Sequence, residues 1–550
     1  IALSHENVAH VTSIVTRLDG LPLAIELVAA RANLLTLEGM AKRIHDLDAF
    51  RQKNRSGRHQ TVTDAVRWSY ELLAAREQLL MRRLAVFDGP FDIAAIEAIC
   101  SDADILPEEA IFPVLSELVE ASLVCASANE RADEQRYALL ETVRQFLRAL
   151  PDPAPEALRG AHAAFFAERA AQAELAYENA GTSEYVALLR RDEENMDAAL
   201  AYAWESRDAL LLGRFVSAFA RLWPPAEMKR RHEIFEYLAR DCDIEQGGPA
   251  FQARVLVALG AYASTSADWH ACKRFRSRAA QRWREAGDEG QALFAESMIA
   301  YVDNYLGASL ADETMPELYR IAGRLREMRA AAWHAAVIEM NLASMELSLG
   351  RTQAALSLAL SALAVARSEK RANYVANSLA ILAKLYLMQD DVRSAERCIE
   401  EAIEITEDSA YAVLRGQALS DRARLRLARG DAAAALRSCA ESLETYERAY
   451  ELRYVARALS VAMEALLALG EPQRAARIAG YVLSAASSTG TVAVAAAFEA
   501  SPACRQTREV LGEGFAAAAQ LGATLTYRDL YNEVAAASSS EDDSRTIRSL

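Results

Sequence analysis

The residues best suited to chemistry are polar side chains that recur before regularly spaced chain turns. The turns fall at Gly350, Asp390, Gly430 and Gly470, 40 residues apart. Before the last three turns stand three polar pairs, each with its members seven residues apart: Asn377 and Lys384, Gln417 and Arg424, Arg457 and Glu464. Seven residues is close to two helical turns, so the members of a pair lie on nearby faces of a helix. Such a polar ladder can bind a protein or peptide; a solvated helix face would give the same pattern.

No catalytic set accompanies these pairs. The chain contains no Gly-x-Ser-x-Gly, no His-Glu-x-x-His and no Gly-Lys dipeptide. His270 and Cys272 could offer two metal ligands, but no second pair with ligand spacing is visible nearby, so we expect a structural role. Two carboxylate pairs lack the glycine of a calcium loop and predict helix caps or turns: Asp102 and Asp104, Asp241 and Asp243. We predict neither a metal site nor a catalytic site.

The elements that must position the polar pairs are helical hairpins. Three columns keep register with the turns: alanine five residues after (Ala355, Ala395, Ala435, Ala475), a small or apolar residue seven before (Ala343, Ala383, Ala423, Met463) and leucine three before (Leu347, Leu387, Leu427, Leu467). Small residues allow close helix approach and leucines fill the space between helices. One hairpin cannot bury its apolar face alone, so neighbouring hairpins must stack.

This repeat resembles a known family. Leu349-Gly350 with Ala355, and Arg429-Gly430-Asp431 with Ala435, look like the turn and following small residue of tetratricopeptide (TPR) repeats, in a unit longer than the usual ~34 residues. Degenerate earlier units surround Gly260 to Ala279 and Gly307. The resemblance implies an α-solenoid over 251–535, including a C-terminal cap. Its concave face is expected to bind a protein, a peptide or a small inducer.

The remaining chain divides by composition and pattern. We expect a helical segment over 1–50, a winged-helix domain over 61–150, a helical connector over 156–245 and a disordered tail over 536–550. Within the winged helix, four helices precede strands at Ser122–Ala126 and Gln135–Leu140, and a last helix follows. The fold is therefore predicted to be mostly α.

Composition narrows the function. The chain has 52% hydrophobic residues and a net charge of −16 with a pI near 5.2, which argues against nucleic-acid binding by bulk electrostatics. Seven scattered cysteines without a Cys-x-x-Cys favour a reducing cytoplasm. The sequence has no long apolar run and no signal sequence, so we expect neither a membrane-spanning nor an exported protein. The first residue is Ile, so we interpret the chain as a fragment of a longer protein.

A second resemblance covers nearly the whole chain. Gly20-Leu-Pro-Leu-Ala24 looks like the GLPL motif of NB-ARC and related STAND-type signalling ATPases. The segments Arg67–Leu73, Leu79–Phe87 and Tyr137–Phe146 follow in order and resemble the winged-helix part of bacterial ATPase-type transcriptional regulators. The match continues through 162–166, 193–200 and 510–516. The chain is thus similar to the C-terminal portion of such a regulator.

The resemblance implies nucleotide-contact residues only for the intact parent. The family's GLPL proline packs against adenine, which nominates Gly20 and Pro22; alternatively, they only shape a helix start. The family's phosphate-sensing histidine is replaced by Leu140. Because the chain lacks the phosphate-binding loop, we expect no ATP hydrolysis and no cofactor here, while the parent could hold ATP or ADP with Mg.

Three functional hypotheses follow. The first is the regulatory and sensor portion of a STAND-type switch whose repeat array binds an inducer or partner. The alternative is a constitutive TPR scaffold with a vestigial nucleotide module. The third is DNA reading by residues 63–86, with the cations Arg76, Arg82 and Arg83, which the net charge disfavours; a missing N-terminal domain is the better place for DNA binding.

Overall fold

A computed structural model describes most of the 550-residue chain. The described residues are 7–18, 20–32, 35–42, 58–128, 135–150, 156–179, 182–220, 222–223, 228, 230–240, 246–265, 268–305, 311–328, 332–407, 411–447, 452–488 and 492–536. Several predicted features lie outside them: the tip of the wing, Asp241 and Asp243, the repeat turn at Gly307 and nearly all of the predicted tail.

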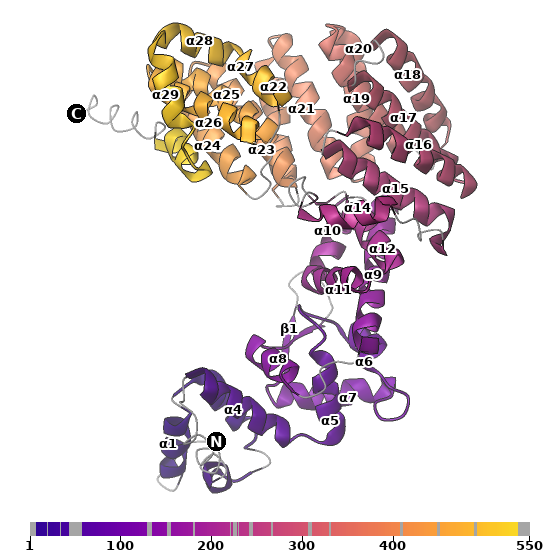
Figure 1. The fold of residues 1–550 in the computed structure, drawn as a ribbon, viewed down its shortest axis with the longest axis vertical. Coiled ribbons are helices and arrows are strands. Elements are labelled where there is room, and N and C mark those ends of the chain that lie inside the picture. Colours follow the sequence, from indigo (N-terminus) through magenta and orange to yellow (C-terminus); the bar gives the residue numbers. More distant parts are fainter. Residues whose placement is uncertain are drawn as a thin grey trace, which may run out of the picture. The chain divides into compact units, whose positions relative to one another are not determined.

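The described residues are predominantly helical, which confirms the predicted mostly-α fold, and they divide into two compact units (Figure 1). Unit 1 comprises Ile1–Ala173 and Ala187–Phe215, and unit 2 comprises Glu174–Val186 and Val216–Leu550. The helices up to the second unit's repeats are α1 (Val8–Arg17), α2 (Pro22–Ala29), α4 (Arg58–Glu71), α5 (Ala75–Leu84), α6 (Ile93–Cys100), α7 (Glu108–Glu120), α8 (Glu141–Arg148), α9 (Glu156–Asn179), α10 (Thr182–Arg191), α11 (Glu193–Glu205), α12 (Ala209–Phe219) and α14 (His232–Arg240).

Unit 1 contains the predicted winged helix. Helices α5, α6 and α7 precede an antiparallel pair, β1 (Cys125–Ala128) and β2 (Gln135–Ala138), in which Cys125 faces Ala138. Phe91 extends the pair through two 2.8 Å backbone hydrogen bonds with Tyr137. The prediction that the first strand spans Ser122–Ala126 is wrong by about three residues. Ser122 takes a left-handed φ of 55° where α7 ends, so the strand begins only at Cys125.

A buried ion network holds the winged helix against the helices that follow it in unit 1. Asp92 at the start of α6 and Asp192 before α11 are both buried. Arg136 of β2 lies 3.4 Å from the Asp92 carboxylate and 2.7 Å from that of Asp192, and Arg169 of α9 lies 2.7 and 2.8 Å from the same two groups. Arg191 also bonds to Asp92. These contacts join segments about a hundred residues apart.

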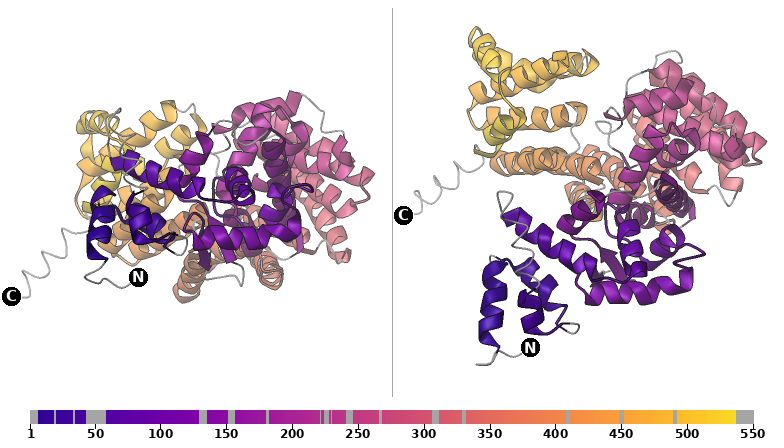
Figure 2. Two further views of the ribbon diagram at one scale, coloured as in Figure 1. Left: turned by 90° about the horizontal axis from the view of Figure 1, so that it is seen from below. Right: turned by 60° about the horizontal axis from the view of Figure 1, so that its bottom comes forward.

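Unit 2 is built from helical hairpins, seen as stacked pairs in Figures 1 and 2. Its helices are α15 (Gly248–Thr265), α16 (Trp269–Glu285), α17 (Glu289–Tyr305), α18 (Ala311–Glu327), α19 (Ala332–Ser348), α20 (Thr352–Ser368), α21 (Ala372–Met388), α22 (Val392–Ile405), α23 (Ala412–Ala428), α24 (Ala432–Tyr446), α25 (Leu452–Ala468), α26 (Pro472–Ser488), α27 (Val492–Glu499), α28 (Pro502–Leu511) and α29 (Gly514–Gly522). A further helix covers 527–536.

The four predicted turns have equivalent structures. Their φ angles are all left-handed, at +74° for Gly350, +59° for Asp390, +82° for Gly430 and +78° for Gly470. The alanine column five residues later is fully buried at 0% exposure in every repeat: Ala355, Ala395, Ala435, Ala475. The leucine column is half-buried against the hydrophobic core in every repeat: Leu347, Leu387, Leu427, Leu467. The predicted stacking of equivalent hairpins is therefore confirmed.

The array ends on a close helix crossing. A Cβ added to Gly480 of α26 would lie 1.8 Å from the backbone oxygen of Ala519 in α29, and one added to Gly522 would lie 1.9 Å from that of Arg477. The two backbones are therefore in direct contact through paired glycines. Arg474 and Arg477 also bind Glu533 at 3.1 and 2.9 Å. These contacts cover the last hairpin; the predicted role of this region as a solenoid cap stays a prediction.

Candidate functional site: the inner face of the repeat array

The first helices of successive hairpins form one continuous face. Helices α19, α21, α23 and α25 pack against one another, whereas among the described residues the second helices α20, α22 and α24 pack mainly against first helices; the last one, α26, packs against α25 and against α27, α28 and α29. In a curved stack, the closer row lies on the inside of the curve. The first helices therefore line the inner face, and all six predicted ladder residues lie on them.

The structure brings four of the six ladder residues together. Arg424 of α23 lies 3.9 Å from the Glu464 carboxylate of α25. Arg457 of α25 forms an ion pair with Asp421 of α23. Arg457, Asp421 and Arg424 all act electrostatically on the Lys384 amine of α21. We call Lys384, Asp421, Arg424, Arg457 and Glu464 the inner-face cluster; it spans three consecutive repeats.

Lys384 shows how this face is shaped. Its side chain is exposed, yet the surrounding protein desolvates its amine. That desolvation, together with the positive charges of Arg457 and Arg424, lowers the pKa of Lys384, and Asp421 opposes part of the change. An accessible but desolvated amine is expected inside a groove, where protein surrounds an open space.

Asp421 belongs to the cluster but was absent from the sequence prediction. It is only 7% exposed, and its Oδ2 atom has no hydrogen-bond partner, while Oδ1 accepts from Arg457. Sequence carried a signal for it, because the same repeat column holds the buried apolar residues Ile381 and Val461. A carboxylate in a core column is costly unless it is paired, so this substitution in the pattern marks a site.

The other two predicted ladder residues are not placed in the cluster by any described contact. Asn377 donates its side-chain amide to the Asn373 carbonyl at 3.0 Å, within α21. Gln417 is half-buried on α23, four residues before Asp421 and therefore on the same helix face. Their proposed partner-binding role stays a prediction.

The nucleotide-contact candidates shape a helix start in this chain. Gly20 has a φ of +64°, and its N–H donates to the Val15 carbonyl at 3.0 Å, so the chain reverses there after α1. Pro22 is exposed at the first position of α2, where a missing N–H costs nothing. The expected contact of Gly20 and Pro22 with nucleotide in the parent stays a prediction.

Residues 63–86, the predicted DNA-reading surface, fall on α4 and α5, whereas the helix that directly precedes the wing is α7, and the exposed face of α7 is acidic. In helix-turn-helix domains the second helix of the motif reads the groove, and here that helix is α7, which directly precedes the wing. Its exposed residues include four glutamates and no lysine or arginine: Glu108, Glu109, Glu117 and Glu120. Arg83, a candidate cation, instead binds the Cys100 and Ser101 carbonyls and the Asp102 carboxylate at 2.7, 3.0 and 2.9 Å.

The weaker chemical candidates have structural roles. His270 is exposed and Cys272 is buried, so the two side chains do not converge. Asp102 Oδ1 accepts from the backbone N–H groups of Asp104 and Ile105, both at 3.0 Å, as predicted for a turn. Within the described ranges, no group of three potential metal ligands is found, and no helix has the length and apolarity needed to cross a membrane.

Comparison with known proteins agrees with this architecture. Residues 73–151 match the model of the winged helix-turn-helix domain, and residues 334–408 match that of the tetratricopeptide repeat. A Mycobacterium tuberculosis protein described as "Putative HTH-type transcriptional regulator" is 33% identical over 225 residues, which cover 40% of this chain and 25% of that protein. An uncharacterized protein of the same species is 35% identical over 149 residues, 26% of this chain and 37% of its own.

Among solved structures, a Signal Transduction ATPase with Numerous Domains (STAND) protein with a tetratricopeptide repeat sensor, from Pyrococcus horikoshii, aligns over 94% of this chain and 75% of its own, with 15% identity and a TM-score of 0.40. The chain spans about a quarter of the length of the regulator relatives it matches. It is a winged-helix and TPR protein with sequence similarity to HTH-type transcriptional regulators.

Proposed function

We propose that this chain is the regulatory and sensor portion of a STAND-type signalling ATPase that regulates transcription, and that its inner face binds an extended peptide or protein segment. The observation that carries the binding role is the inner-face cluster. Three cations and two carboxylates from successive first helices converge there, and one buried carboxylate oxygen lacks a partner. The switch role rests on the family resemblance of residues 20–24 and 67–146.

The charges of the cluster favour an acidic segment. Lys384, Arg424 and Arg457 outnumber the carboxylates Asp421 and Glu464, and desolvation, with smaller contributions from Arg457 and Arg424, lowers the pKa of Lys384. An incoming carboxylate would relieve this repulsion and accept charge-assisted hydrogen bonds. These bonds form only when the partner lies along the inner face.

A peptide-binding experiment tests this role. We would compare a fluorescein-labelled octapeptide pool carrying Asp and Glu at fixed positions with the matched pool carrying Asn and Gln. Fluorescence anisotropy should show binding of the acidic pool at least about tenfold tighter than the amide pool, equivalent to ~1.4 kcal/mol. The double variant Lys384→Glu, Arg424→Glu should lose this preference while keeping its melting temperature.

The matched control reverses two charges on the second-helix row. Arg393 and Arg397 are exposed on α22, outside the inner face. The variant Arg393→Glu, Arg397→Glu should bind the acidic pool like the unmodified chain. Equal affinity for both pools, or equal loss in both double variants, would contradict an inner-face anion site.

The runner-up is a constitutive TPR scaffold, which the replacement of the family's histidine by Leu140 favours. The two differ in the parent gene. A Gly-x-x-x-x-Gly-Lys-[Ser/Thr] loop followed by an acidic strand end upstream of Ile1 would support the switch, and its absence would support the scaffold. In the switch, ATP or ADP with Mg would be held by that upstream module. For the chain itself we expect no ATP turnover.

We further propose that the winged helix of this chain serves regulation and does not read DNA. Its α7 surface carries four glutamates that would face the phosphates. A 30-base-pair duplex in a gel-shift assay at physiological salt should not be retained by this chain below about 1 µM, the strong end of non-specific binding. Retention that persists after substitution of Arg76 and Arg82 would show a different DNA-binding surface.

A further inference from the structure

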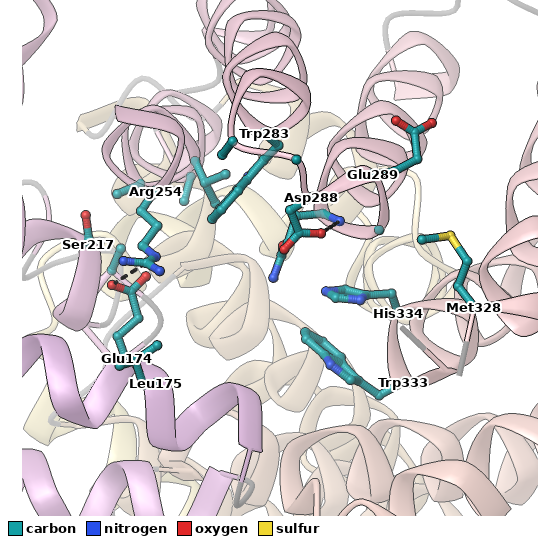
Figure 3. A pocket seen from close by; sticks show the side chains of 18 residues that line it. Glu174, Leu175, Ser217, Arg254, Trp283, Asp288, Glu289, Met328, Trp333 and His334 are labelled. Carbon is teal, nitrogen blue, oxygen red and sulfur yellow. Dashed lines mark hydrogen bonds and ion pairs between the residues drawn. The ribbon is translucent and has the colours of Figure 1, made fainter. Parts of the chain in front are cut away.

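Unit 2 contains a pocket of about 590 Å³, but its polar side chains are already engaged with the protein (Figure 3). Arg254 lies 3.9 Å from the Glu174 carboxylate. Glu289 pairs with an arginine of α16, and Asp288 caps α17. These groups therefore do not select a class of ligand. The outer face of α7 in unit 1 says more about what it binds.

Helix α7 exposes apolar side chains although it already has a core face. Its buried side is formed by Ile111, Val114, Leu115 and Leu118. Phe112, on the other side, is 58% exposed, and Pro113 beside it is exposed as well. Ile105, three residues before the helix begins, is 53% exposed. Exposed apolar residues that cluster in this way indicate an interaction surface, and aromatic residues are the usual anchors of one.

Carboxyl groups surround this apolar cluster. The four exposed glutamates of α7 stand before and after Phe112 along the helix, and α7 contains no lysine or arginine. The pKa of the Glu117 carboxyl is raised, chiefly by a hydrogen bond with the Glu77 carboxyl of α5, then by burial and by the negative charges of Glu77 and Glu120. A lysine or arginine brought to this point would relieve the crowding of negative charge.

The charge of the surface restricts what can cover it. A second copy that docked through the same face would bring two sets of four glutamates together. Nucleic acid or an anionic membrane would meet the glutamates with phosphate groups, which they repel. A positively charged protein surface is attracted instead, and an apolar side chain on it would remove Phe112 from water.

We infer that the outer face of α7 docks a separate partner protein through a basic segment in which lysines or arginines flank an apolar side chain. The apolar side chain packs on Phe112 and Pro113, and the cations pair with the glutamates around them. The inference deepens, and rests on, the proposal that the winged helix serves regulation. The gel shift tests that proposal with DNA, whereas the experiment below uses peptides, so the two can fail separately.

Three fluorescein-labelled dodecapeptides separate the charge from the apolar anchor. The first combines lysines with leucines, the second has glutamine in place of every lysine, and the third has serine in place of every leucine. Fluorescence anisotropy on the full chain should show that the first peptide binds at least about tenfold tighter than either of the others.

Substitutions on α7 test where the peptide binds. Phe112→Ser should weaken binding of the lysine–leucine peptide at least about tenfold, because the aromatic anchor is lost. The double variant Glu117→Gln, Glu120→Gln should weaken it about three- to tenfold, since two charge pairs are lost. These side chains are exposed, so the melting temperature should stay unchanged.

The matched controls change the same residue types in unit 2. Leu521 is 62% exposed, and Glu404 and Glu407 are exposed as well. Leu521→Ser, and the double variant Glu404→Gln, Glu407→Gln, should bind the lysine–leucine peptide like the unmodified chain.

Four results would overturn the inference. The first two are equal affinity for the first and second peptides, and equal affinity for the first and third. The next is a loss of the same size in the α7 variants and in their controls. The last comes from sedimentation velocity: self-association of the unmodified chain that disappears in Phe112→Ser would show that a second copy covers α7.

Discussion

At a few positions the residue type does not suit the backbone conformation that the fold requires there. Asp390 is one such residue. It occupies the left-handed turn that glycine occupies in the other three repeats, with a φ of +59°. No Cβ contact within 4 Å surrounds the equivalent glycines, so the departure is a matter of backbone strain and not of space.

Replacing Asp390 by glycine should therefore stabilise the chain. We expect a gain of about 0.5–1 kcal/mol, since relief of left-handed strain exceeds the added entropy of the unfolded glycine. Thermal unfolding followed by circular dichroism measures it. Gly430→Ala at the equivalent turn is the mirror control and should cost about 1 kcal/mol; the same sign for both changes would refute the strain argument.

His162 makes the chain sensitive to acid. It is buried on α9 between Phe87 and Phe166, with ring centroids 5.5 and 4.7 Å away, and burial lowers its pKa from 6.5 to about 4, opposed in part by Asn195 and Asp88. As the pH falls, His162 therefore binds a proton at a higher pH in the unfolded state than in the folded state. The stability that His162 gives above pH ~6.5 is lost as the pH falls toward 4.

Substituting His162 by phenylalanine should remove this sensitivity. Between pH 7 and pH 5 the histidine form should lose about 2 kcal/mol more stability than the His162→Phe form. Urea unfolding at both pH values measures the difference. A pH dependence that is identical in the two proteins would show that His162 is not responsible.

Among the helices and strands, much could be predicted from the sequence and some could not. The repeat columns predicted the hairpins because each column has one structural role: it reverses the chain, allows two helices to approach closely, or fills the space between them. The first strand of the wing was predicted to begin three residues too early. The β-propensity of Ser122–Val124 does not show that these residues form the end of a helix. The contacts of Asp92 and Asp192 were invisible, because partners a hundred residues apart leave no local pattern.

The ion network of Asp92 should be essential to unit 1. Burial alone would raise the pKa of this carboxyl, but Arg169 and the Ala95 N–H, then Arg191, lower it. Asp92→Asn leaves buried guanidinium groups without their counter-charge and should cost about 3–5 kcal/mol. Thermal unfolding measures the loss. Glu205→Gln, which breaks an exposed ion pair with Arg159, is the control and should cost less than about 1 kcal/mol.

The crossing of α26 and α29 should tolerate no side chain at Gly480. A methyl group there would meet the Ala519 carbonyl, which belongs to backbone and cannot rotate away. Gly480→Ala should therefore cost at least about 1–3 kcal/mol through overpacking. Gly323→Ala, at a helical position with open space around its Cβ, should be neutral or slightly stabilising. Equal effects of the two substitutions would contradict the close crossing.

For the whole molecule, the division into two compact units predicts that the parts unfold separately. Differential scanning calorimetry should resolve two transitions. Asp92→Asn should shift one of them, and Gly480→Ala should shift the other, because the two residues lie in different units. A single transition that moves with either substitution would show that the units unfold together.

Only part of the candidate site could be predicted from the sequence. The ladder prediction found Lys384, Arg424, Arg457 and Glu464 because repeat phase transfers position from one hairpin to the next. It omitted Asp421, because the prediction asked which residues are exposed and this carboxylate is buried in a core column. The tyrosine and tryptophan contacts of Arg371 likewise depend on stacking between helices and not on repeat phase.

The desolvated amine of Lys384 has a practical consequence. A lysine whose pKa is lowered carries a larger fraction of neutral, nucleophilic amine near neutral pH than an ordinary surface lysine does. Acylating reagents should therefore modify Lys384 ahead of its neighbours, and an occupied groove should shield it. Its rate of acylation, read by mass spectrometry, would report occupancy in the intact parent without any label on the partner.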